Sequence, residues 1–128
     1  MELLATDPSD FLNDELRDKA QVKAGEEVVL RASEDGAEVA LVVLSLPSQM
    51  TEAELETLYV PLTLRKRGIA SRALECAEDY CRQRGHTVLK LWANPLDDDT
   101  DQEWLIGWYK RWGYVDSDGG YAELEKAL

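Results

Sequence analysis

The sequence YVPLTLRKRGIASRAL, residues 59–74, decides how this chain folds. An apolar stretch typical of a β-strand runs into a basic turn, and an amphipathic helix begins directly after the turn. Backbone N–H groups at the start of a helix point out of its positive end without intrahelical partners. Gly68 has no Cβ, so a ligand can approach the backbone closely, and Arg65, Lys66 and Arg67 add positive charge. The stretch predicts a phosphate-binding turn rather than a basic turn that is only solvated.

Periodicity and turn signals predict the elements on both sides of this stretch. Strands are expected at 2–5, 26–33, 37–46, 52–60, 87–93, 114–116 and 121–124, and helices at about 9–20, 68–84 and 101–111. Asp35-Gly36 and residues 118–120 are typical hairpin turns. The apolar run 37–46 indicates a strand that is buried on both faces. Thr100 and Glu103 have the spacing of a helix capping box.

Alternation within 52–60 assigns the side chains of that strand to two faces. Leu58 and Val60 are expected to share a face with Glu54 and Glu56. The opposite face is expected to carry Leu55, Thr57 and Tyr59.

The order of these elements predicts a mixed α/β fold. The strand–helix–strand unit over 53–93 implies a parallel pair of strands, and the hairpins imply antiparallel neighbours. We expect one domain over residues 1–128, with six to seven strands in the sheet and about three helices packed on it.

The net charge of −12 is distributed unevenly along the chain. The charges are −10 over residues 1–64, +3 over 65–84 and −5 over 85–128. Such an acidic protein repels nucleic acid and anionic membranes, while its one basic block suits a small polyanion. No apolar run is long enough to span a membrane, and we expect a soluble, cytoplasmic protein.

Cysteine and histidine usage gives no sign of a disulfide framework or a metal site. Cys76 and Cys81 are five residues apart in one predicted helix, so they lie on different sides of it. The single histidine, His86, has no partner ligand and is expected to be structural. We therefore expect no bound metal.

Two motifs resemble those of a known family. The pattern Arg65-x-x-Gly68-x-Ala70 resembles the acetyl-CoA-binding motif of GNAT-type N-acetyltransferases. The segment 108–114 is similar to that family's Tyr-x-x-x-Gly-Phe segment, with tyrosine in the aromatic position. The element order also resembles the GNAT fold, most firmly over 52–115. That family usually has two helices between its first two strands, whereas this sequence has room for one, so the lip over the acceptor is expected to be short.

The resemblance implies acetyl-CoA as co-substrate and a set of residues that bind it. In the family, the backbone of the strand end pairs with the pantetheine arm and supplies an N–H for the oxyanion, and an asparagine on the next strand contacts the arm. Asn94 also reads as a strand-end turn with Pro95, and the two interpretations are compatible. The residues expected to bind coenzyme are Leu58, Tyr59, Val60, Arg65, Lys66, Arg67, Gly68, Ile69, Ala70, Ser71 and Asn94.

Acetyl transfer to an amine needs a base for the amine and an acid for the leaving thiolate. By resemblance, Tyr109 lies near the coenzyme sulfur and acts as the general acid; alternatively it only extends the aromatic core. Family members often place a general base on the strand before the phosphate turn, which here points to Glu54 or Glu56, directly or through water. The alternative is that these carboxylates form a solvated strand face.

Two functions follow from these observations. The first is an N-acetyltransferase that transfers the acetyl group of acetyl-CoA to a primary amine by direct attack in a ternary complex. The second is a catalytically silent GNAT-like protein whose acidic surface engages or inhibits a basic or nucleic-acid-binding partner. The acidic loop 97–101 either caps the following helix or attracts a cationic acceptor, which can be a small-molecule or a protein amine. We expect a monomer, or a homodimer paired through the last hairpin.

Overall fold

The computed structural model describes residues 1–20, 27–117 and 120–128. Its elements are β1 (Glu2–Ala5), the 3-10 helix η1 (Pro8–Asp10), α1 (Asp14–Lys19), β2 (Glu27–Glu34), β3 (Ala37–Ser45), β4 (Glu52–Tyr59), the 3-10 helix η2 (Leu62–Leu64), α2 (Ile69–Gln83), β5 (Val88–Trp92), α3 (Gln102–Arg111), β6 (Val115–Asp116) and β7 (Glu123–Ala127). Strands and helices alternate in the order that the sequence predicts.

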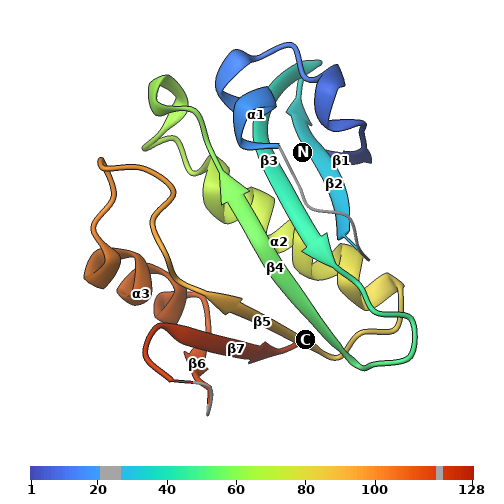
Figure 1. Cartoon of the computed structure of the whole chain (residues 1–128), viewed down its shortest axis with the longest axis vertical. Coiled ribbons are helices and arrows are strands. Elements are labelled where there is room, and N and C mark those ends of the chain that lie inside the picture. Colours follow the sequence, from blue (N-terminus) through green and yellow to red (C-terminus); the bar gives the residue numbers. More distant parts are fainter. Residues whose placement is uncertain (21–26, 118–119) are drawn as a thin grey trace.

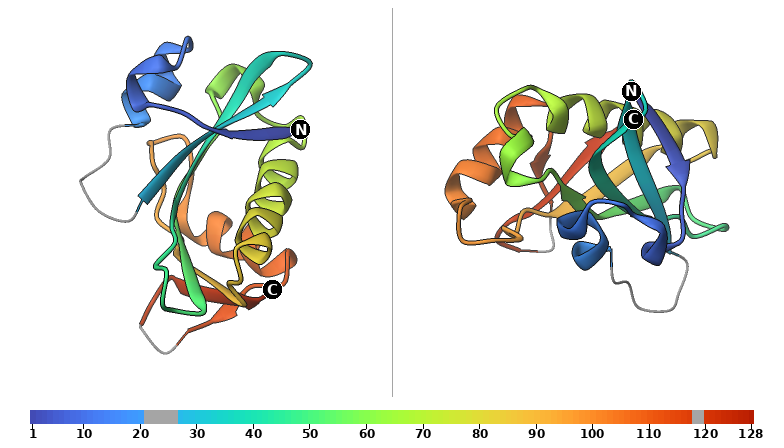
Figure 2. Two further views of the ribbon diagram at one scale, coloured as in Figure 1. Left: turned by 90° about the vertical axis from the view of Figure 1, so that its right-hand side faces the viewer. Right: turned by 90° about the horizontal axis from the view of Figure 1, so that it is seen from above.

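Seven strands form one mixed sheet in the order β1-β2-β3-β4-β5-β7-β6 (Figure 1). The pair β4–β5 is parallel, and the other five pairs are antiparallel. The predicted mixed sheet and its parallel pair are therefore confirmed. Helices α2 and α3 lie on one side of the sheet, while η1 and α1 lie on the other (Figure 2). The central strand β3 is buried along most of its length, as its apolar run predicts.

The core divides into two clusters, one on each face of the sheet. The larger cluster packs β2–β5 and β7 against the apolar side of α2, where Ala73, Leu74 and Ala77 are buried. The smaller cluster lies under α1 and consists of Phe11, Leu16, Ala20, Val29, Leu41, Val43 and Tyr59. Among the described elements, α1 and η1 thus cover only part of this face of the sheet.

The single helix predicted at 9–20 is wrong, because the chain is extended at its middle. Phe11 and Asn13 have extended backbone angles and separate η1 from α1. The carboxylate of Glu38 on β3 accepts the N–H of Leu12 at 2.9 Å and that of Asn13 at 2.8 Å. The Asn13 side chain then caps α1 by accepting the N–H of Leu16 at 3.0 Å. This tertiary capture of two N–H groups gives two short helical segments where sequence reasoning found room for one.

The C-terminal elements differ from prediction in one cap and one boundary. Helix α3 is capped by Asp101, whose side chain accepts the N–H of Trp104 at 3.0 Å, so the predicted Thr100 capping box does not form. The predicted terminal hairpin is confirmed, but β7 extends to Ala127 because it pairs with β5 along Val88–Trp92. Of its predicted turn, residues 118 and 119 lie outside the described residues.

Candidate active site

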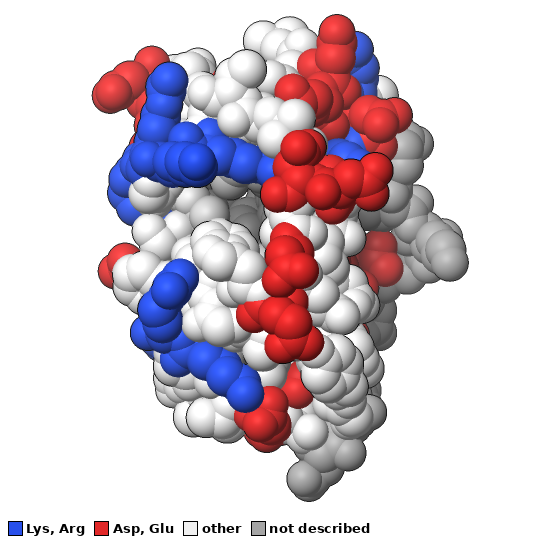
Figure 3. Space-filling view, turned by 90° about the vertical axis from the view of Figure 1, so that its left-hand side faces the viewer, with Lys and Arg blue, Asp and Glu red and all other residues white. Residues whose placement is uncertain are grey.

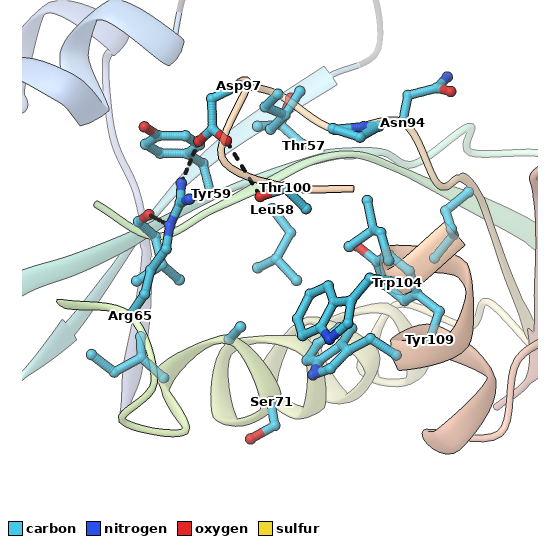
Figure 4. A pocket seen from close by; sticks show the side chains of 18 of the residues that line it. Thr57, Leu58, Tyr59, Arg65, Ser71, Asn94, Asp97, Thr100, Trp104 and Tyr109 are labelled. Carbon is cyan, nitrogen blue, oxygen red and sulfur yellow. Dashed lines mark hydrogen bonds and ion pairs between the residues drawn. The ribbon is translucent and has the colours of Figure 1, made fainter. Parts of the chain in front are cut away.

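A cavity opens where the two parallel strands of the sheet separate. Pairing between β4 and β5 ends at Leu55 and Leu91, yet β4 continues to Tyr59. The backbone of β4 beyond Leu55 therefore loses its β5 neighbour, leaving hydrogen-bonding groups available to an extended ligand. A cavity of about 650 Å³ occupies this opening and is lined by β4, β5, α2, α3 and the segments that join them (Figure 4).

A β-bulge in β4 places Glu56 at this opening. Leu44 of β3 pairs with Leu55 and Val43 pairs with Thr57, so Glu56 is the extra residue. The bulge reverses the alternation: Leu55 and Leu58 both contact the α2-side core, although the sequence predicts opposite faces. The predicted face assignment within 52–60 is wrong for this reason. Glu56 is exposed and lines the cavity.

The basic turn before α2 has the conformation of an anion-binding turn. Lys66 and Gly68 have positive φ angles of 66° and 74°, and Gly68 is the N-cap of α2. No side chain caps this helix. The N–H groups of its first turn, on the cavity side, therefore donate to no capping side chain. Arg72 steadies the turn by donating to the Arg67 carbonyl at 3.1 Å while pairing with Glu34 at 2.7 Å.

Arg65 holds the basic turn against the end of β4 and the loop after β5 through two contacts. Its Nε donates to the Val60 carbonyl at 2.8 Å, and its guanidinium pairs with Asp97 at 2.5 Å (Figure 4). The ion pair holds the pKa of Asp97 below its usual range; for Arg65, burial opposes the charge, but Asp97 outweighs it and raises the pKa. Arg65 lines the cavity, and in this structure its guanidinium is paired with Asp97.

Tyr109 lies at the inner wall of the cavity on α3. The residue is only 6% exposed, and its ring meets those of Trp108 and Tyr114 edge to face, with centroids 5.0 and 5.6 Å apart. Its hydroxyl has no hydrogen-bond partner among the described residues, and burial raises its pKa well above the ordinary value. The hydroxyl therefore stays protonated at neutral pH and can donate to a ligand group.

Glu56 has the properties of a base that works near neutral pH. Although the residue as a whole is exposed, partial desolvation of its carboxyl raises the pKa of Glu56 from 4.5 to about 7, and the neighbouring Glu54 carboxyl and the charge of Glu27 add to the rise. A carboxylate with such a pKa accepts a proton more readily than an ordinary glutamate. Glu54 does not line the cavity, so only one of the two predicted carboxylates lies at it.

Comparison with known proteins gives the family. A model of the acetyltransferase (GNAT) family matches residues 1–114. The chain belongs to the GNAT family. It is therefore an acyltransferase by family. No curated protein matches the chain.

Solved GNAT structures share the fold of this chain. A GNAT acetyltransferase from Elizabethkingia anophelis with acetyl-CoA bound has a TM-score of 0.70 and 14% identity, with 99% of this chain and 97% of that chain covered. A putative acyl-CoA N-acyltransferase from Klebsiella pneumoniae has a TM-score of 0.70 and 20% identity, with the same coverage. PaiA N-acetyltransferase from Thermoplasma acidophilum in complex with coenzyme A has a TM-score of 0.62 and 19% identity; 80% of this chain is covered but only 62% of that longer chain.

Most residues expected to bind coenzyme line the cavity of this GNAT domain. Arg67 does not line it. Ser71 lines it, but its hydroxyl donates back to the Gly68 carbonyl at 2.9 Å, and Figure 4 shows this side chain directed away from the hollow. Asn94 lies at the rim with its amide turned outward, where it accepts from Gln102 at 2.8 Å. The residues that line it as expected are Leu58, Tyr59, Val60, Arg65, Lys66, Gly68, Ile69, Ala70, Ser71 and Asn94.

Sequence reasoning missed the aromatic wall of the cavity. All four tryptophans of the chain line it: Trp92, Trp104, Trp108 and Trp112. Three of them recur at every fourth position, Trp104 and Trp108 within α3 and Trp112 at its C-cap, so helical periodicity is the signal that places them on one side. Trp104 and Trp112 are about half exposed, so the wall is open to solvent.

The charges at the cavity separate by face. Figure 3 shows basic side chains gathered in rows toward the side of α2 and α3, and a band of acidic side chains toward the side of α1. Of the charged residues that line the cavity, Arg65 and Lys66 are basic, and Glu56, Asp97, Asp99 and Asp101 are acidic. The lining of the cavity thus combines the basic turn before α2 with a group of carboxylates. In the part of the chain that the structure describes, no helix is long and apolar enough to cross a membrane.

Proposed function

We propose that this GNAT domain transfers the acetyl group of acetyl-CoA to a primary amine by direct attack in a ternary complex. One observation carries the proposal: a single cavity joins the uncapped N-terminus of α2 to Glu56 on the β4 bulge and to Tyr109. The three positions supply a cradle for the pyrophosphate, a base and an acid within one opening.

The coenzyme fits the chain's own groups. The uncapped first turn of α2 and the open backbone of Gly68 suit a pyrophosphate, because N–H groups and the helix dipole favour negative charge. The β4 backbone beyond Leu55 is left without its β5 neighbour and can pair with the pantetheine amides. A β4 N–H in this segment can also donate to the oxyanion that forms on the thioester carbonyl.

The proton transfers follow from the two side chains. Glu56 accepts a proton from the substrate ammonium, and the amine lone pair then attacks the thioester carbonyl carbon. The new C–N bond forms, the C–S bond breaks, and the departing thiolate takes a proton from the Tyr109 hydroxyl. The attacking nitrogen then carries one proton more than an amide does, and this proton passes to the Tyr109 oxygen, directly or through water, so that coenzyme leaves as the thiol and the phenol is restored. Tyr109 suits this donation because its hydroxyl has no partner among the described residues and stays protonated. Glu54 acts through its negative charge, which helps to raise the pKa of Glu56.

The test is titration of the purified protein with acetyl-CoA, followed by heat release and by tryptophan fluorescence. We expect micromolar binding that the Gly68→Glu variant loses, because its side chain brings negative charge to the phosphate turn. Gly85→Glu is the control: Gly85 follows the C-cap of the same helix with a φ angle of 88°, so both variants strain the backbone, although a Cβ at position 68 also lies 3.1 Å from the Arg72 side chain. Loss of binding in both variants, or no binding at millimolar coenzyme, contradicts the proposal. Binding without turnover of any amine favours the catalytically silent function instead.

A further inference from the structure

One part of the sheet on the α1 side is left without a helix. Helix α1 covers the part formed by Val29, Leu41, Val43 and Tyr59. Farther along the strands, toward Glu27 on β2 and the start of β4, none of the described helices contacts this face (Figures 1 and 2). A sheet face without a covering layer normally carries polar residues, and here the polar residues have one sign.

Five carboxylates occupy this open region. The strand registers align Glu27, Ser45, Glu54, Lys90 and Glu125 in one row across five strands, so their side chains share a face. Two further glutamates on β4 belong to the same region. We name as the acidic sheet face the residues Glu27, Glu52, Glu54, Glu56 and Glu125.

The acidic sheet face has a large excess of negative charge. Lys90 is the one basic side chain that the described registers place among its residues, and it pairs with Glu52 at 3.3 Å. The mutual repulsion is visible at Glu56, because the charges of Glu54 and Glu27 help to raise its pKa. Like charges on adjacent strands cost stability, so this arrangement suits a surface that is neutralised by a cationic ligand.

The acidic sheet face runs directly into the cavity. Glu56 belongs to both, since it lies on the bulge at the opening between β4 and β5. The same cavity is lined by Tyr109, a side chain more than nine-tenths buried whose hydroxyl has no partner among the described residues. A cation bound across the face therefore lies beside the cavity that holds the proposed base, Glu56, and the proposed acid, Tyr109.

The size and openness of the face distinguish between kinds of acceptor. Glu27 and Glu125 are separated by four strand spacings, which is about 19 Å at about 4.8 Å each. About six residues of extended polypeptide cover that length. Small-molecule sites are concave and enclose most of their ligand, whereas this face extends across five strands and no described helix is packed on it.

We propose that the amine acceptor is a lysine side chain within a basic, extended polypeptide segment that lies across the acidic sheet face. This inference rests on the proposed acetyltransferase function. The lysine enters the cavity beside Glu56, and neighbouring basic residues of the segment lie over Glu27, Glu54 and Glu125. Attack by the lysine Nζ forms an amide and removes one positive charge, since the proton passes to Glu56. The product is therefore held less strongly by the face than the substrate, which favours its release.

The experiment compares two short peptides that are blocked at both ends and contain one lysine. In one peptide arginines flank the lysine at alternate positions, and in the other glutamines replace the arginines. We expect kcat/KM for the basic peptide to be at least about tenfold higher at low salt, with the difference shrinking at high salt because exposed charges are screened. Equal kcat/KM for the two peptides, or a linear polyamine acetylated in preference to both, overturns the inference.

A double variant tests the surface itself. Glu27→Gln/Glu125→Gln removes two charges from the face without touching the cavity, and we expect KM for the basic peptide to rise about fivefold at unchanged acetyl-CoA affinity. Glu2→Gln/Glu75→Gln removes the same charge from two exposed positions outside the acidic sheet face and should leave KM unchanged. An equal rise in both double variants overturns the inference. Coenzyme binding that persists without acetylation of either peptide overturns it alone, while loss of coenzyme binding overturns the proposed function.

Discussion

The two faces of the sheet are built from the same strands but carry different chemistry. On the α2 side, the strands present aliphatic residues that the long helix buries, and the basic turn at the helix start offers unpartnered N–H groups. On the α1 side, a short helix buries one patch, and the remainder presents the glutamates of the acidic sheet face. Because successive strand residues point to opposite faces, one sheet separates an anion site from a cation-attracting surface.

The side of the sheet with the basic turn and the side with the glutamates adjoin at the opening between β4 and β5. The β4 bulge interrupts the alternation there, and Glu56 is the carboxylate that it places at the cavity.

Replacing Glu56 by glutamine is expected to have the largest effect, because it removes the base at the opening. We expect kcat for the basic lysine peptide to fall by about a thousandfold. In the parent protein, the rate should rise with pH through about 7, since Glu56 must lose its proton to act, and this step should vanish in the variant. Assays of acetyl transfer at pH values from about 5 to about 9, which bracket about 7, measure both the fall in kcat and the pH dependence of the rate.

Glu54→Gln is the matched control on the same strand. It removes a charge that raises the pKa of Glu56, so the pH profile should move to lower pH while the maximal rate changes little. A loss of rate as large as that of Glu56→Gln would assign the base to Glu54 and contradict the role of the bulge.

Tyr109→Phe tests the other wall of the cavity. Removing the hydroxyl should lower kcat by about a hundredfold, because the thiolate loses its proton donor. The melting temperature should change little, since this hydroxyl has no partner among the described residues to lose. Single-turnover kinetics and thermal unfolding measure the two quantities.

Tyr114→Phe is the structural counterpart of that change. The Tyr114 hydroxyl donates to the buried Glu78 at 2.8 Å, and Glu78 also pairs with Lys126 at 3.1 Å. Its loss should lower the free energy of unfolding by about 1–3 kcal/mol while kcat stays close to that of the parent. If instead Tyr109→Phe destabilises the fold and leaves kcat intact, Tyr109 is only a core residue.

Arg65→Gln tests the link between the phosphate turn and the loop after β5. The variant loses a part-buried pair with Asp97 and a bond to the Val60 carbonyl, so we expect unfolding free energy to fall by about 1–2 kcal/mol. Arg82→Gln removes an exposed helix pair with Asp79 and should cost at most about 0.5 kcal/mol. Chemical denaturation compares the two; equal costs would show that the Arg65 pair behaves as an ordinary surface contact.

The smallest effect concerns stability and pH at Glu56. Its pKa is raised in the folded protein from 4.5 to about 7, so the folded state loses stability as pH rises across that interval and Glu56 ionises. Glutamine cannot ionise, and Glu56→Gln should therefore melt slightly above the parent at pH 8 but not at pH 4. The opposite sign at pH 8 would mean that the ionised carboxylate is stabilised at the opening, and that the electrostatic picture of the acidic sheet face is wrong.

Much of the fold could be predicted because its signals are local. The Val- and Leu-rich run of β3, the Asp35-Gly36 turn and the amphipathic pattern of α2 each act over a few residues. The basic turn before α2 belongs to the same class, since its shape depends on a backbone conformation that a glycine at position 68 permits.

Other features depend on partners distant in sequence. The helix predicted at 9–20 is divided because Glu38 on β3 accepts the backbone N–H groups of Leu12 and Asn13. Arg65 is matched by Asp97, which follows it by 32 residues and is brought alongside only by folding. No local pattern marks either contact.

Local sequence patterns are enough to predict the order of elements, the mixed sheet and the basic turn before α2, and they show which residue types are available as acid and base. Which glutamate lies at the cavity depends on the folded sheet, because a β-bulge arises from the way two strands pair and reverses the faces that alternation predicts. Likewise, the row of glutamates became a surface only when five strands were set side by side. Local propensities act along the chain, whereas cross-strand register is fixed by packing against the whole core.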